Sequence, residues 1–274
     1  MAKKPKGARP VALITGASGG IGEALAHEFA RGGYDLVLVA RSEGKLAGVA
    51  RAMEAHGAKA CVIPLDLETR GAGADLEARV AELGLEVDAL VNNAGYGVTG
   101  AVLDADLAAQ LGEVDLNIRV LTELSARFGA GMRARGRGGI LNVSSIAAFQ
   151  PGPFMAVYYA SKAYVLSFTE AMNRELRGTG VHATALCPGP VATGFQARAA
   201  FDASMGVSKL PGQTAEQTAR AGYQAFRRRQ AVIIPGGLNF FAAKSASVTP
   251  RGVLLSIVEG LQKKRLGDDS HAAR

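Results

Sequence analysis

Seven short apolar segments alternate with segments of helical periodicity along most of this chain. The apolar segments are Val11–Thr15, Asp35–Ala40, Lys59–Asp66, Val87–Asn92, Gly139–Ser144, Val181–Leu186 and Ala231–Ile234. The helical segments are Ile21–Arg31, Glu43–His56, Asp75–Leu83, Leu107–Arg135, Val157–Leu176, Thr214–Arg227 and Thr249–Lys263. Strands that are apolar throughout and separated by helices are typical of a parallel sheet covered on both faces. The pattern therefore predicts a doubly wound α/β fold.

No internal repeat or linker divides this pattern, so the 274 residues are expected to form one domain. We expect the domain to span residues 11–265, between a basic flexible tail at 1–10 and a second flexible tail at 266–274. Hydrophobic residues make up 48% of the chain and charged residues 20%, which excludes disorder of the whole. The uncharged run 140–161 is long enough to resemble a membrane span, but its polar residues and prolines favour a strand, a loop and a helix start.

The two cysteines indicate the cellular compartment of the protein, and its net charge bears on the kind of partner that it binds. Cys61 and Cys187 fall in different predicted strands and are expected to be buried free thiols, which fits a reducing cytoplasm. The net charge is +7, with basic clusters at both ends and at 227–229. Such clusters occur in nucleic-acid binders and also on solvated tails and helix faces. Because no recognisable nucleic-acid motif or metal-ligand spacing accompanies them, we expect neither a nucleic acid nor a metal as a partner.

A glycine-rich turn lies between the first predicted strand and the first predicted helix. Gly16, Gly20 and Gly22 there allow a sharp turn and a close approach of the backbone to a pyrophosphate, which a helix N-terminus also attracts. A tight strand–helix turn with no ligand would look similar. Arg41 follows the second strand where an acidic residue would hold ribose hydroxyls, and it can pair with a 2′-phosphate. No carboxylate is expected to compete there, so the pattern favours NADP(H) over NAD(H), although a plain surface arginine is the alternative.

Tyr158 and Lys162 are four residues apart and so share one face of a helix. A lysine ammonium placed there can lower the pKa of the phenol from its usual value of about 10 and make it a general acid/base. Such pairs also arise by chance. Ser145 precedes Tyr158 by 13 residues and ends the fifth strand, so both hydroxyls can reach one substrate oxygen. Asn117 in the middle of a predicted helix costs helix propensity and is either exposed or functional.

Six motifs occur in the order T-G-x-x-x-G-I-G, N-N-A-G, a helix Asn, S-S, Y-x-A-S-K and P-G-x-V-x-T. In order and spacing they resemble the short-chain dehydrogenase/reductase family over roughly residues 11–193. The resemblance implies a Rossmann-type sheet of order 3-2-1-4-5-6-7, which would hold the two cysteines five strands apart. It also implies that Tyr158 is the general acid/base, that Lys162 binds the nicotinamide ribose, that Ser145 polarises the carbonyl and that Asn117 holds a water of the proton relay.

The same resemblance implies a set of residues that hold the cofactor. They are Gly16, Ser18, Gly20, Ile21, Gly22, Arg41, Asp66, Leu67, Asn92, Ala94, Gly95, Tyr158, Lys162, Pro188, Gly189, Val191 and Thr193. Asp66 could accept a hydrogen bond from the adenine amino group, although a capping or turn role fits equally well. The function implied is the NADP(H)-dependent interconversion of a ketone or aldehyde and an alcohol. The alternatives are a catalytically silent nucleotide-sensing protein and an epimerase or dehydratase with the same tyrosine and lysine.

Two further expectations concern the substrate and the assembly. Residues 195–215 combine small residues with Phe195, Phe201, Met205, Val207 and Leu210. This composition suits a lid over a small, mostly apolar substrate, or else a surface loop packed on the core.

The helices that carry Asn117 and Tyr158 resemble those that pair in family oligomers, so a homodimer or homotetramer is expected. The outward faces of these helices are predicted to include residues from the set Leu121, Leu124, Phe128, Leu166 and Phe168, some of which must belong to the core.

Overall fold

The computed structural model describes residues 9–191 and 213–272, with only the backbone of 264–272. Its centre is a seven-stranded sheet in the order β3-β2-β1-β4-β5-β6-β7, and every pairing within it is parallel. The strands are β1 Val11–Thr15, β2 Asp35–Ala40, β3 Ala60–Pro64, β4 Val87–Asn92, β5 Gly138–Val143, β6 Val181–Leu186 and β7 Val232–Ile233. The predicted fold class and strand order are confirmed.

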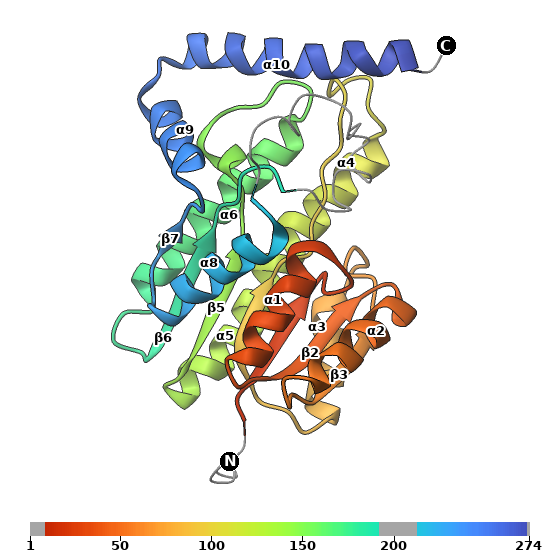
Figure 1. Ribbon diagram of the computed structural model, residues 1–274, viewed down its shortest axis with the longest axis vertical. Helices are drawn as coiled ribbons and strands as arrows, with labels where there is room; N and C mark the ends of the chain where they lie inside the picture. The colour runs from red at the N-terminus through yellow and green to blue at the C-terminus, as the bar shows by residue number, and fades with distance from the viewer. Residues whose placement is uncertain (1–8, 192–212, 273–274) are drawn as a thin grey trace.

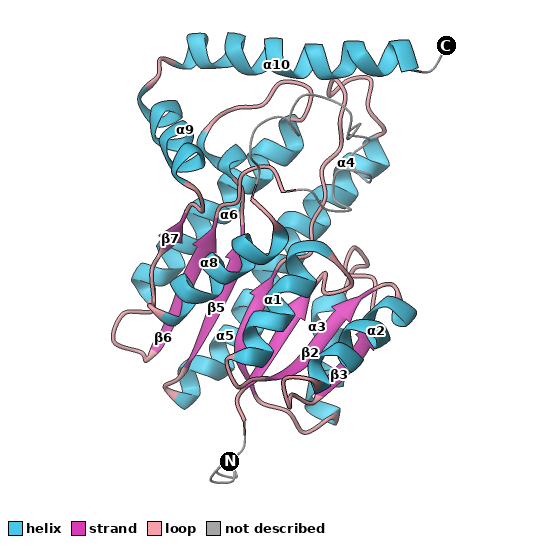
Figure 2. Cartoon of the chain, viewed as in Figure 1, coloured by secondary structure: helices cyan, strands magenta, loops and turns pink. Residues whose placement is uncertain are grey.

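Helices cover both faces of the sheet (Figures 1 and 2). They are α1 Gly20–Arg31, α2 Glu43–Glu54, α3 Ala72–Glu82, α4 Leu107–Val114, α5 Leu121–Arg135, α6 Ala156–Glu175, α8 Ala215–Arg227, α9 Gly237–Val248 and α10 Arg251–Ala272. Alternate strand residues point to opposite faces. Ala12 and Ile14 of β1 pack with α1, α2 and α8, while Val11 and Leu13 pack with α3, α5 and α6. Two separate apolar layers therefore hold the sheet.

The helical region predicted over 107–135 is interrupted by a π-helical segment, η1, at Asp115–Val120. Asn117 lies in this segment, and its side chain exchanges hydrogen bonds with the backbone of Tyr96 instead of facing solvent. Short π segments are often found at functional sites because they turn one side chain out of the regular helical register. A mid-helix asparagine thus has a structural reason here.

The C-terminal region contains one helix that the sequence pattern did not predict. Helix α9 begins after Gly236, whose φ of +86° suits glycine, and α10 follows it to Ala272, beyond the helix end predicted at Lys263. In Figure 1, α10 lies at the top of the view, beyond α9 and away from the sheet. Among the described residues, no helix is both long and apolar enough to cross a bilayer.

The predicted oligomer face is corrected by the packing. Leu121, Leu124 and Phe128 are buried in the core beneath the sheet, and Leu166 and Phe168 are only half-buried. The exposed apolar row on this side belongs to α4 instead and comprises Leu107, Leu111 and Val114. The buried apolar residues of α5 and the exposed apolar residues of α4 both follow helical spacing. The sequence alone therefore cannot tell which of the two faces the core and which faces solvent.

Both cysteines are free, and five positions in the strand order separate their strands. Cys187 is buried directly after β6, as expected. Cys61 is only half-buried, against expectation, because β3 is the edge strand of the sheet.

Candidate active site

The site lies where the carboxyl ends of the parallel strands meet, the usual position for ligands in doubly wound sheets. The glycine-rich turn follows β1 and leads into α1. Gly16 and Gly20 adopt φ values of +65° and +57°, which favour glycine. A Cβ on Gly22 would lie 2.2 Å from the carbonyl oxygen of Gly16, so this turn cannot hold a larger residue without moving. No side chain caps α1 at Gly19, so its first N–H groups fit a phosphate.

The loop after β4 fixes this turn in place. Asn93 Nδ2 donates hydrogen bonds to the carbonyl groups of Thr15 and Gly16, at 3.0 and 3.2 Å. Thr15 Oγ1 accepts from the backbone N–H groups of Asn93 and Ala94, both at 3.0 Å. Asn93 was not among the predicted site residues, although it belongs to the N-N-A-G motif. Its role is to lock two strand-end loops together.

Asn92, which was predicted to contact the cofactor, is buried between strands and a helix. Its Nδ2 donates to Asn142 Oδ1 at 2.9 Å and to Ser125 Oγ at 3.0 Å. Its Oδ1 has no hydrogen-bond partner among the described residues. These contacts tie β4 to β5 and α5, so the side chain supports the site from beneath.

Arg41 lies at the end of β2, as expected, but it has acidic neighbours. Its Nη1 is 3.9 Å from Asp66 Oδ2 and 3.8 Å from Glu68 Oε1. The expectation that no carboxylate competes for Arg41 is therefore wrong. Both carboxylates follow β3, which pairs with β2, so they reach Arg41 across the sheet edge. The side chains of Arg41 and Asp66 are 51% and 47% exposed, so these contacts are weak and leave room for a ligand.

Tyr158 and Lys162 lie on α6 and face the end of β5. Lys162 Nζ donates to the carbonyl oxygen of Val143 at 3.1 Å and lies 5.7 Å from the centre of the Tyr158 ring. Ser145, just beyond β5, is hydrogen-bonded to Tyr158 and accepts from the N–H of Ala147. The two hydroxyls therefore lie next to each other, and that both reach one substrate oxygen stays a prediction.

Asn117 joins the same group from the other side. Its Nδ2 donates to the Tyr96 carbonyl oxygen at 2.8 Å and to Ser161 Oγ at 3.0 Å. A Cβ added to Gly95 would lie 2.8 Å from Asn117 Oδ1 and 3.4 Å from Lys162 Nζ. Gly95 thus lets the Asn117 amide and the Lys162 ammonium approach the loop after β4. The structure brings all four predicted catalytic residues together.

Burial dominates the ionisation of the central pair. The pKa of Tyr158 is raised to about 12 by desolvation, with the Ser145 hydrogen bond acting against it. The pKa of Lys162 is lowered to about 8 by desolvation, against the attraction of Glu113 and of Cys187. The Tyr158 pKa is thus not lowered below its usual value, against the prediction, because desolvation dominates in this structure.

The remaining predicted site residues lie on three other loops. Ser18 and Ile21 belong to the turn before and the start of α1, and Leu67 is buried after β3. Pro188 and Gly189 follow β6, and a Cβ on Gly189 would meet Asn239 of α9 at 2.3 Å. Val191 forms a bridge with Gln213. Thr193 and most of the predicted lid, including Phe195, Phe201, Met205, Val207 and Leu210, lie outside the described residues.

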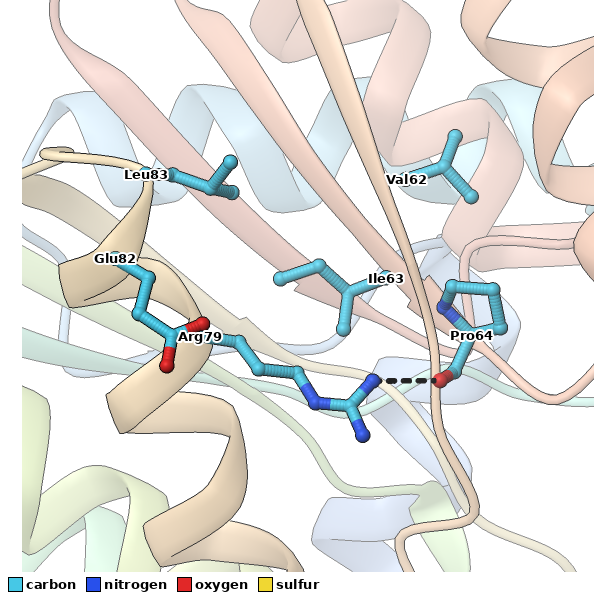
Figure 3. Close-up of a pocket in the computed structure, with 6 residues that line it drawn as sticks. All are labelled: Val62, Ile63, Pro64, Arg79, Glu82 and Leu83. Atoms are coloured by element: carbon cyan, nitrogen blue, oxygen red, sulfur yellow. Dashed lines mark hydrogen bonds between the residues drawn. The ribbon is translucent and has the colours of Figure 1, made fainter.

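A separate pocket lies at the outer edge of the sheet, between β3 and α3 (Figure 3). It is lined by Val62, Ile63, Pro64, Arg79, Glu82 and Leu83. Arg79 Nη1 donates to the Pro64 carbonyl oxygen at 3.3 Å across it. None of the predicted site residues lines this pocket, so it is distinct from the catalytic tetrad, as we call Asn117, Ser145, Tyr158 and Lys162 together. No cluster of three metal-ligating side chains occurs in the described part of the chain.

The doubly wound sheet and the glycine-rich turn after β1 define a Rossmann-type α/β protein. A family model described as short chain dehydrogenase matches residues 10–203. The chain belongs to this family of oxidoreductases.

Similar proteins include enzymes of known cofactor or substrate. Ketoacyl reductase HetN of Nostoc sp. is 33% identical over 81% of this chain and 77% of its own. A Sphingobium yanoikuyae short-chain dehydrogenase in complex with NADPH is 32% identical, with a TM-score of 0.77 over 86% of this chain and 93% of its own. A bulky-bulky ketone specific alcohol dehydrogenase from Comamonas testosteroni is 30% identical, with a TM-score of 0.73 over 86% and 91%.

Proposed function

We propose that the protein is an NADP(H)-dependent oxidoreductase that interconverts a ketone or aldehyde and an alcohol. The observation that carries this proposal is the convergence of Asn117, Tyr158 and Lys162 on one loop at the strand ends, with Ser145 hydrogen-bonded to Tyr158. A bound nicotinamide cofactor supplies the hydride. Incubation with NADPH and a panel of ketones, quinones, sterols and acyl thioesters tests the proposal, and NADPH oxidation with at least one of them is expected.

In this proposal the protein holds the substrate oxygen and moves one proton. Ser145 and Tyr158 hydrogen-bond the carbonyl oxygen, and Tyr158 releases its phenolic proton as that oxygen gains charge. The high pKa of Tyr158 keeps this proton in place at neutral pH. Lys162 places a positive charge beside the ring, where it stabilises the phenolate that forms. Asn117 holds a water through which the proton is replaced.

The predicted cofactor-binding residues are kept as part of this proposal, with Asn92 supporting the site from beneath. The turn 16–22 would hold the pyrophosphate and Arg41 would hold the 2′-phosphate. Asp66 and Leu67 would contact the adenine. The nicotinamide ribose would be contacted by Ala94, Gly95 and Lys162, and the carboxamide by residues 188–193. The fit is supported by the uncapped start of α1 and by Gly16 and Gly22, whose added Cβ atoms would clash within the tight turn.

The preference for NADPH is expected to be moderate because Arg41 is shared with Asp66 and Glu68. A charge-assisted hydrogen bond contributes about 1.5–3 kcal/mol, or roughly 10–150-fold, and we expect the lower end of this range. Arg41→Asp is expected to reverse the preference, measured as the ratio of kcat/KM for NADPH and NADH. Arg51→Asp makes the same charge change on α2 and should leave the ratio unchanged. Equal kcat/KM values for the two cofactors in the wild type would contradict the proposal.

The substrate class proposed is a mostly apolar carbonyl compound larger than acetone. The bulky-ketone specificity of the Comamonas relative supports it, as does the apolar composition of the predicted lid. We also propose a cytoplasmic location, supported by the two free thiols.

We propose that copies of the chain associate through the exposed apolar row of α4. Leu111 is 55% exposed, and Leu107 and Val114 lie beside it at helical spacing. Leu111→Glu is expected to convert a dimer or tetramer into monomers in light scattering at micromolar concentration. Leu261→Glu is the matched control, since Leu261 is 56% exposed on α10. A monomeric wild type, or dissociation by the control alone, would contradict this interface.

A further inference from the structure

A carboxyl group that the proposed reaction does not use lies inside the site. Glu113 of α4 has no exposed surface and precedes Asn117 by one helical turn. Its Oε2 accepts a hydrogen bond from the backbone N–H of Val98 at 3.0 Å, and its Oε1 lies 3.5 Å from Asn117 Nδ2. Burying a carboxyl group costs free energy unless charge or hydrogen bonds compensate it. Its position beside the tetrad therefore needs a physical reason.

The backbone segment that Glu113 holds is the one that the tetrad surrounds. A Cβ added to Gly95 would lie 2.8 Å from Asn117 Oδ1 and 3.4 Å from Lys162 Nζ. A Cβ added to Gly97 would lie 3.0 Å from Cδ2 of the Tyr158 ring. Segment 95–98 is thus in contact with three of the four tetrad residues. The bond from Glu113 to the last N–H of this segment fixes how closely it approaches them.

Glu113 also acts electrostatically on Lys162, the charged group of the tetrad. Lys162 is buried, and its pKa is held up by Glu113 and, to a smaller extent, by Cys187. Burial raises the pKa of Glu113 to about 7. The Val98 hydrogen bond and the positive charge of Lys162 act in the opposite direction and limit this rise. The pKa of Tyr158 is raised in part by Glu113. These three groups form one electrostatic unit inside the site.

The other ionisable groups near this turn of α4 are engaged elsewhere. Glu68 approaches the neighbouring Gly112, where an added Cβ would lie 3.1 Å from Glu68 Oε2, and it also lies near Arg41. Asp115 is paired with Arg119 on the same helical segment. Neither carboxylate influences the ionisation of Lys162 as Glu113 does.

We propose that Glu113 is a positioning residue of the active site, which holds segment 95–98 against Tyr158 and, when ionised, keeps Lys162 in its ammonium form. This inference rests on the proposed function only for its effect on turnover, because the contacts of Glu113 with Val98 and Asn117 are present in the free protein. Protonation of Glu113 around neutral pH then makes the charge of the site depend on pH.

The variant Glu113→Gln separates charge from shape. The amide oxygen still accepts from Val98 N–H, but the negative charge is gone. Below about pH 6 Glu113 is itself protonated, so the two proteins should behave alike there. At about pH 8 the loss of the charge lowers the pKa of Lys162 by about one unit, as removal of a nearby opposite charge does. A smaller fraction of Lys162 is then charged, and kcat/KM should be about fivefold below wild type.

The decisive readout uses the free protein and needs no substrate. In protein labelled with ¹³Cε-lysine, the Lys162 signal, assigned by its absence in Lys162→Met, is followed by NMR against pH. We expect a midpoint about one pH unit lower in Glu113→Gln than in wild type. Glu82→Gln, which removes an exposed carboxylate of α3, should leave the midpoint unchanged. Equal Lys162 midpoints in wild type and Glu113→Gln would overturn the proposal.

Two further observations keep the test decisive. If Glu113→Gln does not fold, the wild-type titration still decides, because the Lys162 signal must show an additional inflection near pH 7 as Glu113 ionises. A titration without this inflection overturns the proposal. A shifted midpoint without turnover of any carbonyl compound would leave the positioning role of Glu113 standing and refute only the proposed function.

Discussion

Tyr158→Phe is expected to lower turnover by about 100- to 10,000-fold, the usual contribution of a general acid, while NADPH binding stays nearly unchanged. The substitution removes the hydroxyl that is hydrogen-bonded to Ser145, and the ring that packs on segment 95–98 remains. Single-turnover kinetics with NADPH and a responsive ketone, together with calorimetric titration of NADPH, measure the two effects separately.

Tyr159→Phe is the matched control for this result. Tyr159 is the adjacent tyrosine, but its hydroxyl accepts a hydrogen bond from Gln262 of α10 at 3.2 Å and contributes to the contact between α6 and α10. Its loss should cost about 1 kcal/mol of unfolding free energy and little activity. If Tyr159→Phe abolished turnover and Tyr158→Phe did not, the assignment of the general acid on α6 would be wrong.

Gly22→Ala is expected to disrupt the turn that leads into α1. The new methyl group would lie 2.2 Å from the Gly16 carbonyl oxygen and 2.5 Å from Asn93 Nδ2, so the whole strand-end cradle must move. We expect a loss of about 1–3 kcal/mol of unfolding free energy, as in other overpacked sites. NADPH affinity should fall at least about tenfold, which corresponds to 1.4 kcal/mol.

Gly48→Ala is the matched control, because the same added methyl group is expected to raise the free energy of unfolding instead of lowering it. Gly48 lies within α2, where an added Cβ would have no atom within 4 Å, so the change should stabilise the helix by about 0.5–1 kcal/mol. Urea unfolding and NADPH titration of both variants give the comparison. Unchanged stability and NADPH affinity in Gly22→Ala would show that this turn is not the cofactor cradle.

The sequence predicts the sheet well because burial on both faces leaves a continuous apolar signature in each strand. The strands β1, β2, β4 and β6 have the predicted bounds, and the strand order agrees. Helix α9 could not be predicted because its face pattern is weak and glycines precede it. The π segment at Asp115–Val120 could not be predicted either, because it contains Asn117, whose hydrogen bonds go to Tyr96, 21 positions away in the chain.

The four tetrad residues are predictable from spacing and resemblance, whereas their surroundings are not. Glu113 looks like an ordinary exposed residue in a helix, and only tertiary packing places it against Val98. The acidic neighbours of Arg41 arise from the pairing of β2 with β3. Both features depend on contacts between residues far apart in the chain, which a local pattern cannot encode.

The measurement that tests the proposed reaction most directly follows a deuterium label from NADPH labelled at the nicotinamide C4 position. With a ketone that supports NADPH oxidation, the label is expected on the carbinol carbon of the product in wild type, and label transfer should be nearly abolished in Tyr158→Phe. If NADPH binds but no carbonyl compound ever receives the label, the protein is a nucleotide-binding protein without this chemistry. If a substrate is converted without net NADPH oxidation, the protein is an epimerase or dehydratase, and either result contradicts the proposed function.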